Sequence, residues 1–328
     1  MMFNNRSKTA CSHCRNPRYV SKKRRSDGCH QEDQPCATMG QLSLADQLAL
    51  LIHNKETREP LLYRSERSPS MDGYTDIFDG SIYKNLRKDG YFKNELDIAL
   101  ALYTDGFTCF QKEQLTIIHI VILNLPPDIR YENKMMIQVG IIPGPKAPRN
   151  IFGYLSLLLK DLRKLESCGI HVKADDKNIY TARAHLLLAT GDLPATTKLA
   201  KHRTHTYTFG CRVCEIPGGA IVINGRKRGM YFPPRRRVAK TRKLSDFKNG
   251  NKEKGLLKSP LASLKTFHGS TFWGLDCMHL LAHGLLLSYF YKTTLSLIFC
   301  CRNWKAVLKT SLWKVWRHWQ SLVSTTGD

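Results

Sequence analysis

The sequence predicts a mixed α/β fold, and the order of its apolar segments carries that prediction. Three short apolar runs come first, at residues 98–103, 115–125 and 135–142, and turns with glycine or proline separate them. Residues 151–167 then show the clearest helical pattern of the chain, with one apolar stripe. Residues 186–189 are a fourth apolar run, of the right length for a buried strand. The expected order is three strands, one helix and one strand.

Because the first three strands follow one another closely, we expect an antiparallel meander. This order opens the ribonuclease H-like fold, in which the first and fourth strands are neighbours. Asp105 follows the first strand and Asp192 the fourth, so their carboxylates should face each other. Hard cations prefer carboxylate oxygens, and phosphoryl transfer needs acids from different elements, so the pair is expected to bind Mg²⁺ or Mn²⁺. Taken singly, each aspartate is more often a turn residue or a helix N-cap.

Composition limits the class of protein. The 328 residues, 42% of them hydrophobic, are enough for a real core. A net charge of +24 points to a polyanionic partner, with nucleic acid ahead of an anionic membrane surface. Residues 1–8 lack the apolar core of a signal peptide, so eleven cysteines favour a reducing compartment and metal binding. No membrane span is expected, because His283 and Lys292 interrupt the longest apolar stretch.

The chain is expected to divide into six parts. Ser43 is the expected N-cap of a helix that ends near His53, and the polar residues 56–73 after it indicate a linker. The parts are a Cys-rich basic segment (1–40), the helix and linker (41–73), the core (74–217), a basic insertion (218–270), a metal-ligand segment (271–284) and a divergent tail (285–328).

The first part contains a candidate zinc site. Cys11 and Cys14 have the spacing of a zinc-ligand pair, and Cys29, His30 and Cys36 follow at irregular spacing. A disordered basic arm with incidental thiols is the alternative. The basic run at 22–25 resembles a nuclear-import patch and favours a nuclear location.

A second candidate zinc site joins two distant segments. Cys211 and Cys214 have the spacing of zinc ligands. His279 and His283 are four residues apart, on one side of a helix, and would complete a Cys₂His₂ site. The alternatives are that His202 and His205 are the other ligands, or that the thiols and imidazoles are ordinary buried groups.

A basic segment separates the two halves of that site. Residues 221–225 predict a β-hairpin with an Asn-Gly turn, and residues 226–258 then contain few acids. Such a segment is expected to contact DNA or RNA, and a solvated loop is the alternative. The candidate nucleic-acid-binding residues are Arg226, Lys227, Arg228, Arg235, Arg236 and Arg237.

The chain resembles the CACTA-type (En/Spm-like) transposase family of cut-and-paste DNA transposons. Between residues 74 and 217 the resemblance is carried by YTDIFDG, DIALALYTDGF, ILNLPPDIRYE, VGIIPGPKAP, LLATGDLPA and GCRVCEIPG. CSHCRNPRY and FWGLDCMHLLAHG match outlying motifs. The resemblance implies an RNase H-like catalytic domain of the acid-acid-glutamate type, in which Asp105 is the first metal-binding acid and Asp192 the second. It also implies a zinc-stabilised insertion built from Cys211, Cys214 and the segment around 276–283.

Such enzymes nick and join transposon ends, so the implied partner is transposon-end DNA in the nucleus; association into a homo-oligomer stays open. The family's third acid lies downstream of the histidine-containing segment, but residues 277–327 contain no Asp or Glu. We therefore expect a truncated or frame-disrupted copy with impaired catalysis. The alternatives are a third carboxylate from Glu95 or Asp97, an amphipathic helix in the tail, and a non-enzymatic, zinc-stabilised nucleic-acid-binding protein.

Overall fold

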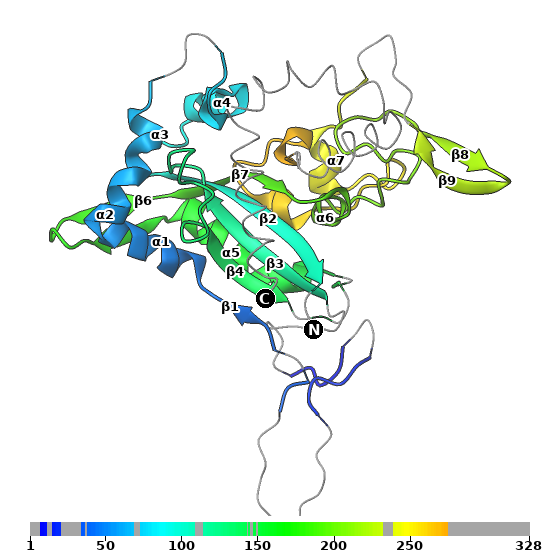
Figure 1. Ribbon diagram of the computed structural model, residues 1–328, viewed down its shortest axis with the longest axis horizontal. Helices are drawn as coiled ribbons and strands as arrows, with labels where there is room; N and C mark the ends of the chain where they lie inside the picture. Colours follow the sequence, from blue (N-terminus) through cyan, green and yellow to red (C-terminus); the bar gives the residue numbers. More distant parts are fainter. Residues whose placement is uncertain are drawn as a thin grey trace, which may run out of the picture. The chain divides into compact units, whose positions relative to one another are not determined.

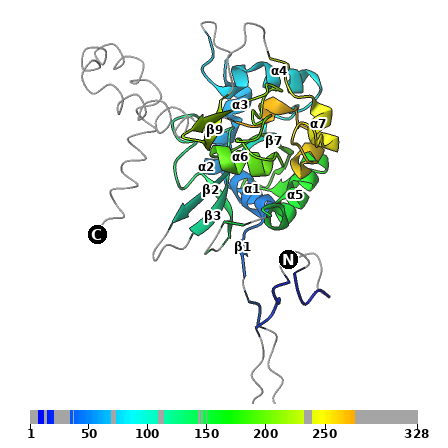
Figure 2. The same cartoon turned by 90° about the vertical axis from the view of Figure 1, so that its right-hand side faces the viewer.

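Five strands form one mixed sheet in the computed structural model (Figures 1 and 2). The described residues are 7–11, 15–20, 34–36, 38–68, 73–108, 114–142, 144, 147, 148, 150–231 and 239–274, without the side chains of 107, 108, 227–229 and 231. They all belong to one compact unit, within residues 1–274.

The sheet has the strand order β1-β4-β3-β2-β7. β2, β3 and β4 form the expected antiparallel meander, and β7 pairs parallel with β2. The first and fourth core strands are therefore neighbours, as the sequence predicted. The strands are β1 (Gly40–Gln41), β2 (Ile98–Thr108), β3 (Gln114–Ile122), β4 (Ile137–Ile142) and β7 (Ala184–Thr190).

Two helices supply much of the cover for one face of the sheet. α1 (Leu44–His53) begins at Ser43, whose hydroxyl accepts a hydrogen bond from the backbone N–H of Asp46, as the sequence predicted. α5 (Phe152–Ser167) is the crossover helix between β4 and β7. Both bury leucines at helical spacing in the same cluster as Ile98, Leu100 and Leu102 of β2.

The opposite face, which we call the α4 face, packs against a smaller cluster. The 3₁₀ turn η2 (Ile77–Asp79) and α4 (Ser81–Lys88) contribute Phe78, Tyr83 and Leu86. These side chains pack with Ala99 and Ala101 of β2, because alternate residues of a strand point to opposite faces. The helices thus lie on both faces of the sheet.

The polar segment after α1 is not a linker, and that prediction is wrong. It forms α2 (Lys55–Arg58), η1 (Glu59–Leu62) and α3 (Tyr63–Glu66). Arg58 and Arg64 are buried despite their charge. Arg64 donates hydrogen bonds to the backbone carbonyls of Asn94, Glu95 and Asp97, just before β2 begins. Composition alone indicated solvent exposure, whereas backbone carbonyls satisfy this guanidinium inside the core.

The sequence did not predict the hairpin between α5 and β7. β5 (Ile170–Lys173) and β6 (Ile179–Ala182) form a separate two-stranded sheet. Arg58 holds it to α2 through Asp175 (3.3 Å) and Asp176 (3.1 Å). The hairpin is part of the crossover that carries the chain back to β7.

Residues after β7 form α6 (Leu193–Leu199), a second hairpin of β8 (Gly219–Ile223) and β9 (Arg226–Tyr231), α7 (Leu244–Asn249), η4 (Pro260–Ser263) and η5 (Ser270–Phe272). The predicted basic insertion (218–270) is only partly exposed, because Phe247, Leu261 and Phe267 are buried in the main core, together with Phe272 and Trp273 just after it. The boundary expected at 217 therefore does not end the core. None of the described helices combines the length and apolar character needed to cross a bilayer.

Candidate active site at the ends of β2 and β7

Asp105 lies in β2 just beyond the point where the neighbouring parallel strand ends. Tyr103 is the last residue of β2 that pairs with β7, opposite Thr190, and Asp105 follows two positions later. β2 itself continues to Thr108, because β3 extends the antiparallel pairing. Asp105 is thus inside β2, which corrects the expected strand end. Its exposed side chain accepts a hydrogen bond from the backbone N–H of Gly106 (2.8 Å).

Asp192 stands at the corresponding place after β7. It follows Thr190 by two positions and is the N-cap of α6. Its Oδ1 accepts a hydrogen bond from the backbone N–H of Ala195 at 2.6 Å, which satisfies one of the helix's unpaired donors. The half-buried Asp192 is therefore held in place by the start of α6.

Gly191 brings the backbones of the two segments together. Its φ is 157°, and a Cβ at this position would lie 2.5 Å from the carbonyl oxygen of Thr104. A side chain would prevent so close an approach, so glycine is required here. Because residue 191 lies against residue 104, the next residues, Asp192 and Asp105, start from neighbouring backbone positions. The two core strands are neighbours as expected, and the approach of the two carboxylates stays a prediction.

Four buried polar side chains near the ends of β2 and β7 lack a hydrogen-bond partner among the described residues, but they are divided between the two faces of the sheet. His119 lies in β3 opposite Tyr103, and burial lowers its pKa, an effect that the charge of Asp105 partly offsets. The imidazole is therefore neutral near pH 7. Buried polar groups are nearly always paired, so each unpaired atom needs its own explanation, and together they do not mark one site. Seven buried side-chain atoms of the described residues have no hydrogen-bond partner. Three lie elsewhere in the core, and the four near the ends of β2 and β7 are Thr104 Oγ1, His119 Nδ1, Thr190 Oγ1 and Trp273 Nε1.

The carboxylates of Asp105 and Asp192 are chemically suited to a hard cation, because carboxylate oxygens are the ligands that Mg²⁺ prefers. Within the described ranges, however, no group of three His, Cys, Asp or Glu residues assembles. Asp97 precedes Asp105 by eight residues, about 26 Å along the strand. Its carboxylate accepts hydrogen bonds from the backbone N–H groups of Asn94 and Arg183. Asp97 and the nearby Glu95 are therefore excluded as the third carboxylate.

The comparison with known families supports a function in DNA transposition. Residues 76–265 match the model described as Transposase family tnp2, which is more than half of the 328 residues and includes both aspartates. The chain belongs to this transposase family. It has no match among curated proteins. The tnp2 match continues past residue 217, in agreement with the packing of α7 and η4 into the core.

Cys211 and Cys214 of this tnp2-family chain lie together with their Sγ atoms 3.4 Å apart. Both are free thiols. Two sulfurs that bind one zinc ion tetrahedrally at about 2.3 Å lie about 3.8 Å apart, whereas a disulfide is about 2.05 Å long. Burial raises the pKa of Cys214, and the neighbouring Cys211 raises it further. A cation would offset that effect, so the pair fits half of a zinc site.

His202 and His205 do not complete that half-site, and these alternatives are excluded. His202 Nε2 lies 2.8 Å from the carbonyl oxygen of Phe209 and 3.1 Å from a guanidinium nitrogen of Arg242. His205 is exposed, and the part of the chain that the structure describes contains no group of three metal ligands around the cysteines. The remaining predicted ligands, His279 and His283, lie outside the described residues.

Several other predicted residues are described only in part. The backbone carbonyl of Cys11 accepts a hydrogen bond from the backbone N–H of Arg15 (2.8 Å). Cys14 lies outside the described residues, and so do Arg235, Arg236 and Arg237. Arg226 begins β9 and is exposed; Lys227 and Arg228 follow it in the same strand.

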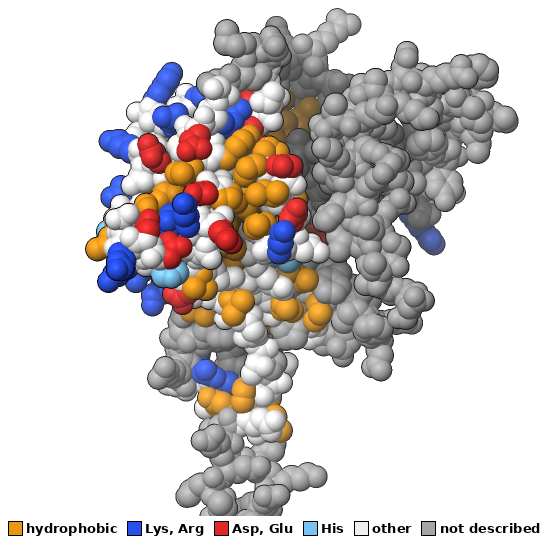
Figure 3. All heavy atoms as spheres, turned by 60° about the vertical axis from the view of Figure 1, so that its left-hand side comes forward, with side chains coloured by type: hydrophobic (Ala, Val, Ile, Leu, Met, Phe, Trp, Pro, Cys, Tyr) orange, Lys and Arg blue, Asp and Glu red, His pale blue; other side chains and the backbone are white. Residues whose placement is uncertain are grey.

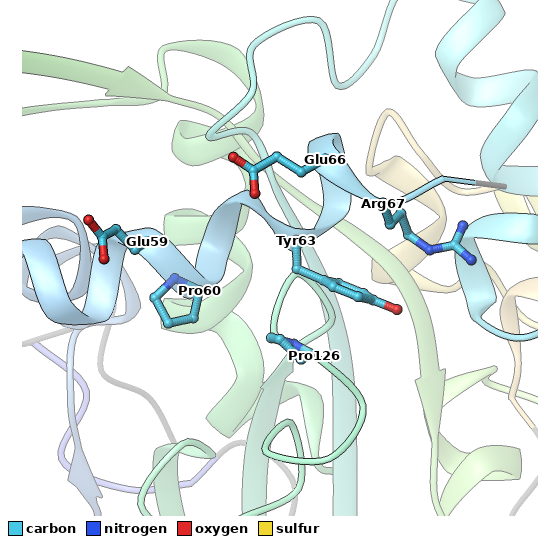
Figure 4. Close-up of a pocket in the computed structure, with 6 residues that line it drawn as sticks. All are labelled: Glu59, Pro60, Tyr63, Glu66, Arg67 and Pro126. Atoms are coloured by element: carbon cyan, nitrogen blue, oxygen red, sulfur yellow. The ribbon is translucent and has the colours of Figure 1, made fainter.

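A surface hollow of about 370 Å³ is not part of the acid-pair site. On the face drawn in Figure 3, hydrophobic side chains gather beside acidic ones. Asn124, close to Pro126, bonds to Leu61 and Asp97, which places the hollow at the opposite end of β2 from Asp105. Figure 4 shows its lining residues, Glu59, Pro60, Tyr63, Glu66, Arg67 and Pro126.

Two residues of the acid-pair site had not been singled out from the sequence. His119 is the one ionisable residue in the apolar run 115–125, and that interruption was the available signal. Gly191 stands between Thr190 and Asp192, where a strand passes into a helix. Its close approach to Thr104 involves residues 87 positions apart, so no local pattern reveals it.

Proposed function

We propose that the chain is a DNA-processing protein of transposon origin with an RNase H-like core of the CACTA type. Membership of the tnp2 family supports a transposase-like function. The order β4-β3-β2-β7, with β2 and β7 parallel, supports the fold. The approach of Gly191 to Thr104 carries the proposal, because it gives Asp105 and Asp192 neighbouring backbone positions. The proposed substrate is duplex DNA at transposon ends.

Asp105 and Asp192 would hold Mg²⁺ or Mn²⁺. Such an ion neutralises charge on phosphate and activates a water or a 3′ hydroxyl. The protein's own contribution is to present two carboxylates from different strands, one of them fixed as the N-cap of α6. The neutral imidazole of His119 lies beside Asp105 without adding a positive charge that would repel the cation.

We further propose that strand cleavage is impaired. No group of three possible metal ligands occurs among the described residues, and residues 277–327 contain no Asp or Glu. A site short of one metal-binding acid should lose most of its two-metal catalysis. Gly274 lies against β7, since a Cβ there would be 3.2 Å from Thr190 Oγ1. Asp276 follows two positions later in the sequence, so it is the residue to test as a third carboxylate.

Structural zinc is the other part of the proposal. Cys211 and Cys214 would bind one ion together with His279 and His283, and Cys11 and Cys14 would contribute to another. A closed set of four ligands stabilises the fold and leaves no position open for chemistry. Metal analysis of the purified chain, with Cys211→Ser as the variant, should show zinc that the substitution lowers. Equal zinc content in the wild type and in Cys211→Ser would contradict the proposed zinc site at Cys211.

The test is a nicking assay in Mg²⁺ or Mn²⁺ on duplexes that carry the terminal repeats of the element encoding the chain. Asp105→Asn and Asp192→Asn are the variants, because asparagine keeps the N-cap and removes the charge. We expect salt-sensitive binding with little or no nicking. Efficient wild-type nicking that both variants abolish would show that catalysis is intact and the impairment wrong. Asp276→Asn would then identify or eliminate the third acid.

One observation favours a second candidate, a non-enzymatic nucleic-acid-binding protein with vestigial aspartates. The hydrogen bonds of Asp105 to Gly106 and of Asp192 to Ala195 give both acids a local structural role. Titration with Mn²⁺, followed by electron paramagnetic resonance, separates the two candidates. Binding that is lost in Asp105→Asn supports the metal site, and equal weak binding in both proteins supports the vestigial role.

A nuclear location completes the proposal. It depends on the basic run at residues 22–25, which lies outside the described part of the chain. A fluorescent fusion in which the four basic residues are replaced by alanine should lose nuclear accumulation. Unchanged accumulation would show that another signal, or none, directs the chain.

A further inference from the structure

The β8–β9 hairpin is a two-stranded ribbon outside the main sheet (Figure 1). Its strands pair with each other from Gly219 and Tyr231 to Ile223 and Arg226. Every residue of β8 is exposed, so no described element covers this strand. A two-stranded hairpin is marginally stable by itself in water, which makes an uncovered one a candidate for binding a partner.

The outer half of this ribbon exposes large aliphatic side chains. Ile221 is 40% exposed, Val222 60% and Ile223 52%. Folding gains little from aliphatic groups that remain in water. Three consecutive ones near the tip of a hairpin are therefore better explained by a partner than by the stability of the fold.

Basic residues accompany the aliphatic ones. Arg226 pairs with Ile223, and Lys227 with Val222, in the antiparallel register, and Arg228 is the next residue of β9. No Asp or Glu occurs in residues 219–231. Directly paired residues share one face of a ribbon, so each face near the tip has one aliphatic and one basic position. This charge balance favours a polyanion over an apolar protein surface.

The turn keeps the ribbon narrow. Asn224 and Gly225 both have positive φ, 49° and 72°, as a two-residue hairpin turn of the tightest kind requires. The two strands lie about 4.8 Å apart. The major groove of B-DNA is about 12 Å wide and admits a two-stranded β-ribbon. The ribbon therefore has the dimensions and the charge to enter a duplex groove.

We propose that the β8–β9 ribbon is a DNA-binding arm that enters the major groove of duplex DNA. The exposed Arg226 contacts a phosphate beside the groove, in a sequence whose next two residues are also basic, and the aliphatic residues 221–223 contact base edges and thymine methyl groups. This inference deepens the proposed function, because it rests on duplex DNA as the partner. It assigns the contact to a ribbon separate from the acid pair.

Fluorescence anisotropy of the full chain tests the arm, with labelled A·T-rich and G·C-rich duplexes of equal length over a range of salt. The charge variant is R226A/K227A/R228A. The matched control is K84A/R87A/K88A, which removes the same number of charges from exposed positions of α4. We expect the charge variant to bind at least tenfold more weakly and to lower the slope of log K against log salt by up to about 2.7. The α4 control should change affinity less than threefold.

A second variant, I221S/I223S, tests the base contacts without changing charge. It should reduce the preference for A·T-rich over G·C-rich duplex at least threefold and leave the salt slope unchanged. The thermal midpoint of each variant should equal that of the wild type, since the ribbon is outside the core. If a variant has a lower thermal midpoint than the wild type, a different variant takes its place in the binding measurement. In that variant a Gly-Ser linker replaces residues 220–230, which shortens the ribbon.

The outcomes separate this inference from the proposed function. If the wild type fails to bind either duplex with salt-sensitive affinity, the proposed function fails. If the wild type binds and the charge variant behaves like the α4 control, the chain binds DNA through another surface, and the inference that the β8–β9 ribbon is the DNA-binding arm is wrong. If I221S/I223S dissociates an oligomer in sedimentation and leaves DNA binding unchanged, the aliphatic face contacts a second copy, which also overturns the arm.

Discussion

Single residues decide whether the two aspartates meet. Asp192 is the N-cap of α6, and the residue before it, Gly191, lies against the backbone of Thr104. A cap and a metal ligand are compatible, because a carboxylate has two oxygens and about four lone pairs. Within the described ranges the structure adds no third carboxylate to the predicted pair.

Replacing Gly191 with alanine should separate the two backbones. The new Cβ would need to move from 2.5 Å of the Thr104 carbonyl oxygen, at a φ of 157° that side chains rarely adopt. We expect a loss of about 2–4 kcal/mol in the free energy of unfolding, measured by urea denaturation. Gly40→Ala is the matched control, because no atom lies within 4 Å of its Cβ position. Equal stability of both variants would contradict the close approach.

Two buried histidines should make stability depend on pH. Burial lowers the pKa of His185 to about 4, and burial together with Arg242 lowers that of His202 to about 4, from 6.5. The unfolded chain therefore binds more protons than the folded chain between about pH 4 and pH 6.5, so stability falls as pH falls through this window. Each histidine contributes a slope of up to about 1.4 kcal/mol per pH unit.

His185→Phe checks the histidine contribution. His185 contacts the rings of Tyr91 and Phe92 edge-on, so a phenyl ring suits the site. The free energy of unfolding, measured in urea from pH 4 to pH 7, should depend less steeply on pH in the variant. The difference should correspond to about one bound proton fewer on unfolding. Identical pH profiles for the variant and the wild type would show that His185 does not titrate as inferred.

At the scale of elements, buried arginines join segments whose sequences appear polar. Arg64 of α3 donates to Asp97 O (2.9 Å), Asn94 O (2.6 Å) and Glu95 O (2.9 Å). It thereby holds the turn that leads into β2, the strand that carries Asp105. α3 is thus an anchor of the central sheet, although its composition predicted a linker.

Arg64→Met should destabilise the fold strongly. Three backbone carbonyls would lose their donor inside the protein, at a cost of about 3 kcal/mol or more in total. Lysine should not rescue the site, because an ammonium group lacks the planar fork of donors. Glu66→Ala, at an exposed position of the same helix, is the control and should change stability by less than about 0.5 kcal/mol. Equal midpoints of chemical denaturation for Arg64→Met and the control would show that Arg64 does not anchor α3 to the turn before β2.

At the scale of the whole molecule, the core closes with residues far along the chain. Phe247, Phe272 and Trp273 are at most 3% exposed and belong to the cluster that includes α1 and α5. The tnp2 match also extends to residue 265. The expected domain boundary at 217 therefore divides one core into two parts.

A fragment of residues 38–274 should fold, and a fragment of residues 38–217 should not. Loss of three large buried aromatic residues costs about 3–5 kcal/mol each, which approaches or exceeds the whole stability of a typical domain. Near-ultraviolet circular dichroism and urea denaturation distinguish the two fragments. A cooperative transition in the shorter fragment would show that residues 244–274 are dispensable for the core.

The sequence by itself predicted the central meander, α5 and the capped α1 from local periodicity, caps and turns, and it predicted from the order of the elements that the fourth core strand lies beside the first. The pairing of Asp105 and Asp192 was inferred from the strand order and stays a prediction, and Asp105 lies inside β2 and not at its end. Only the tertiary structure decided the buried helices at 55–66, the aromatic return at 244–274 and the place of His119. Those features depend on contacts between residues distant in sequence: carbonyls that satisfy a buried guanidinium, and apolar rings that complete a core begun more than a hundred residues earlier.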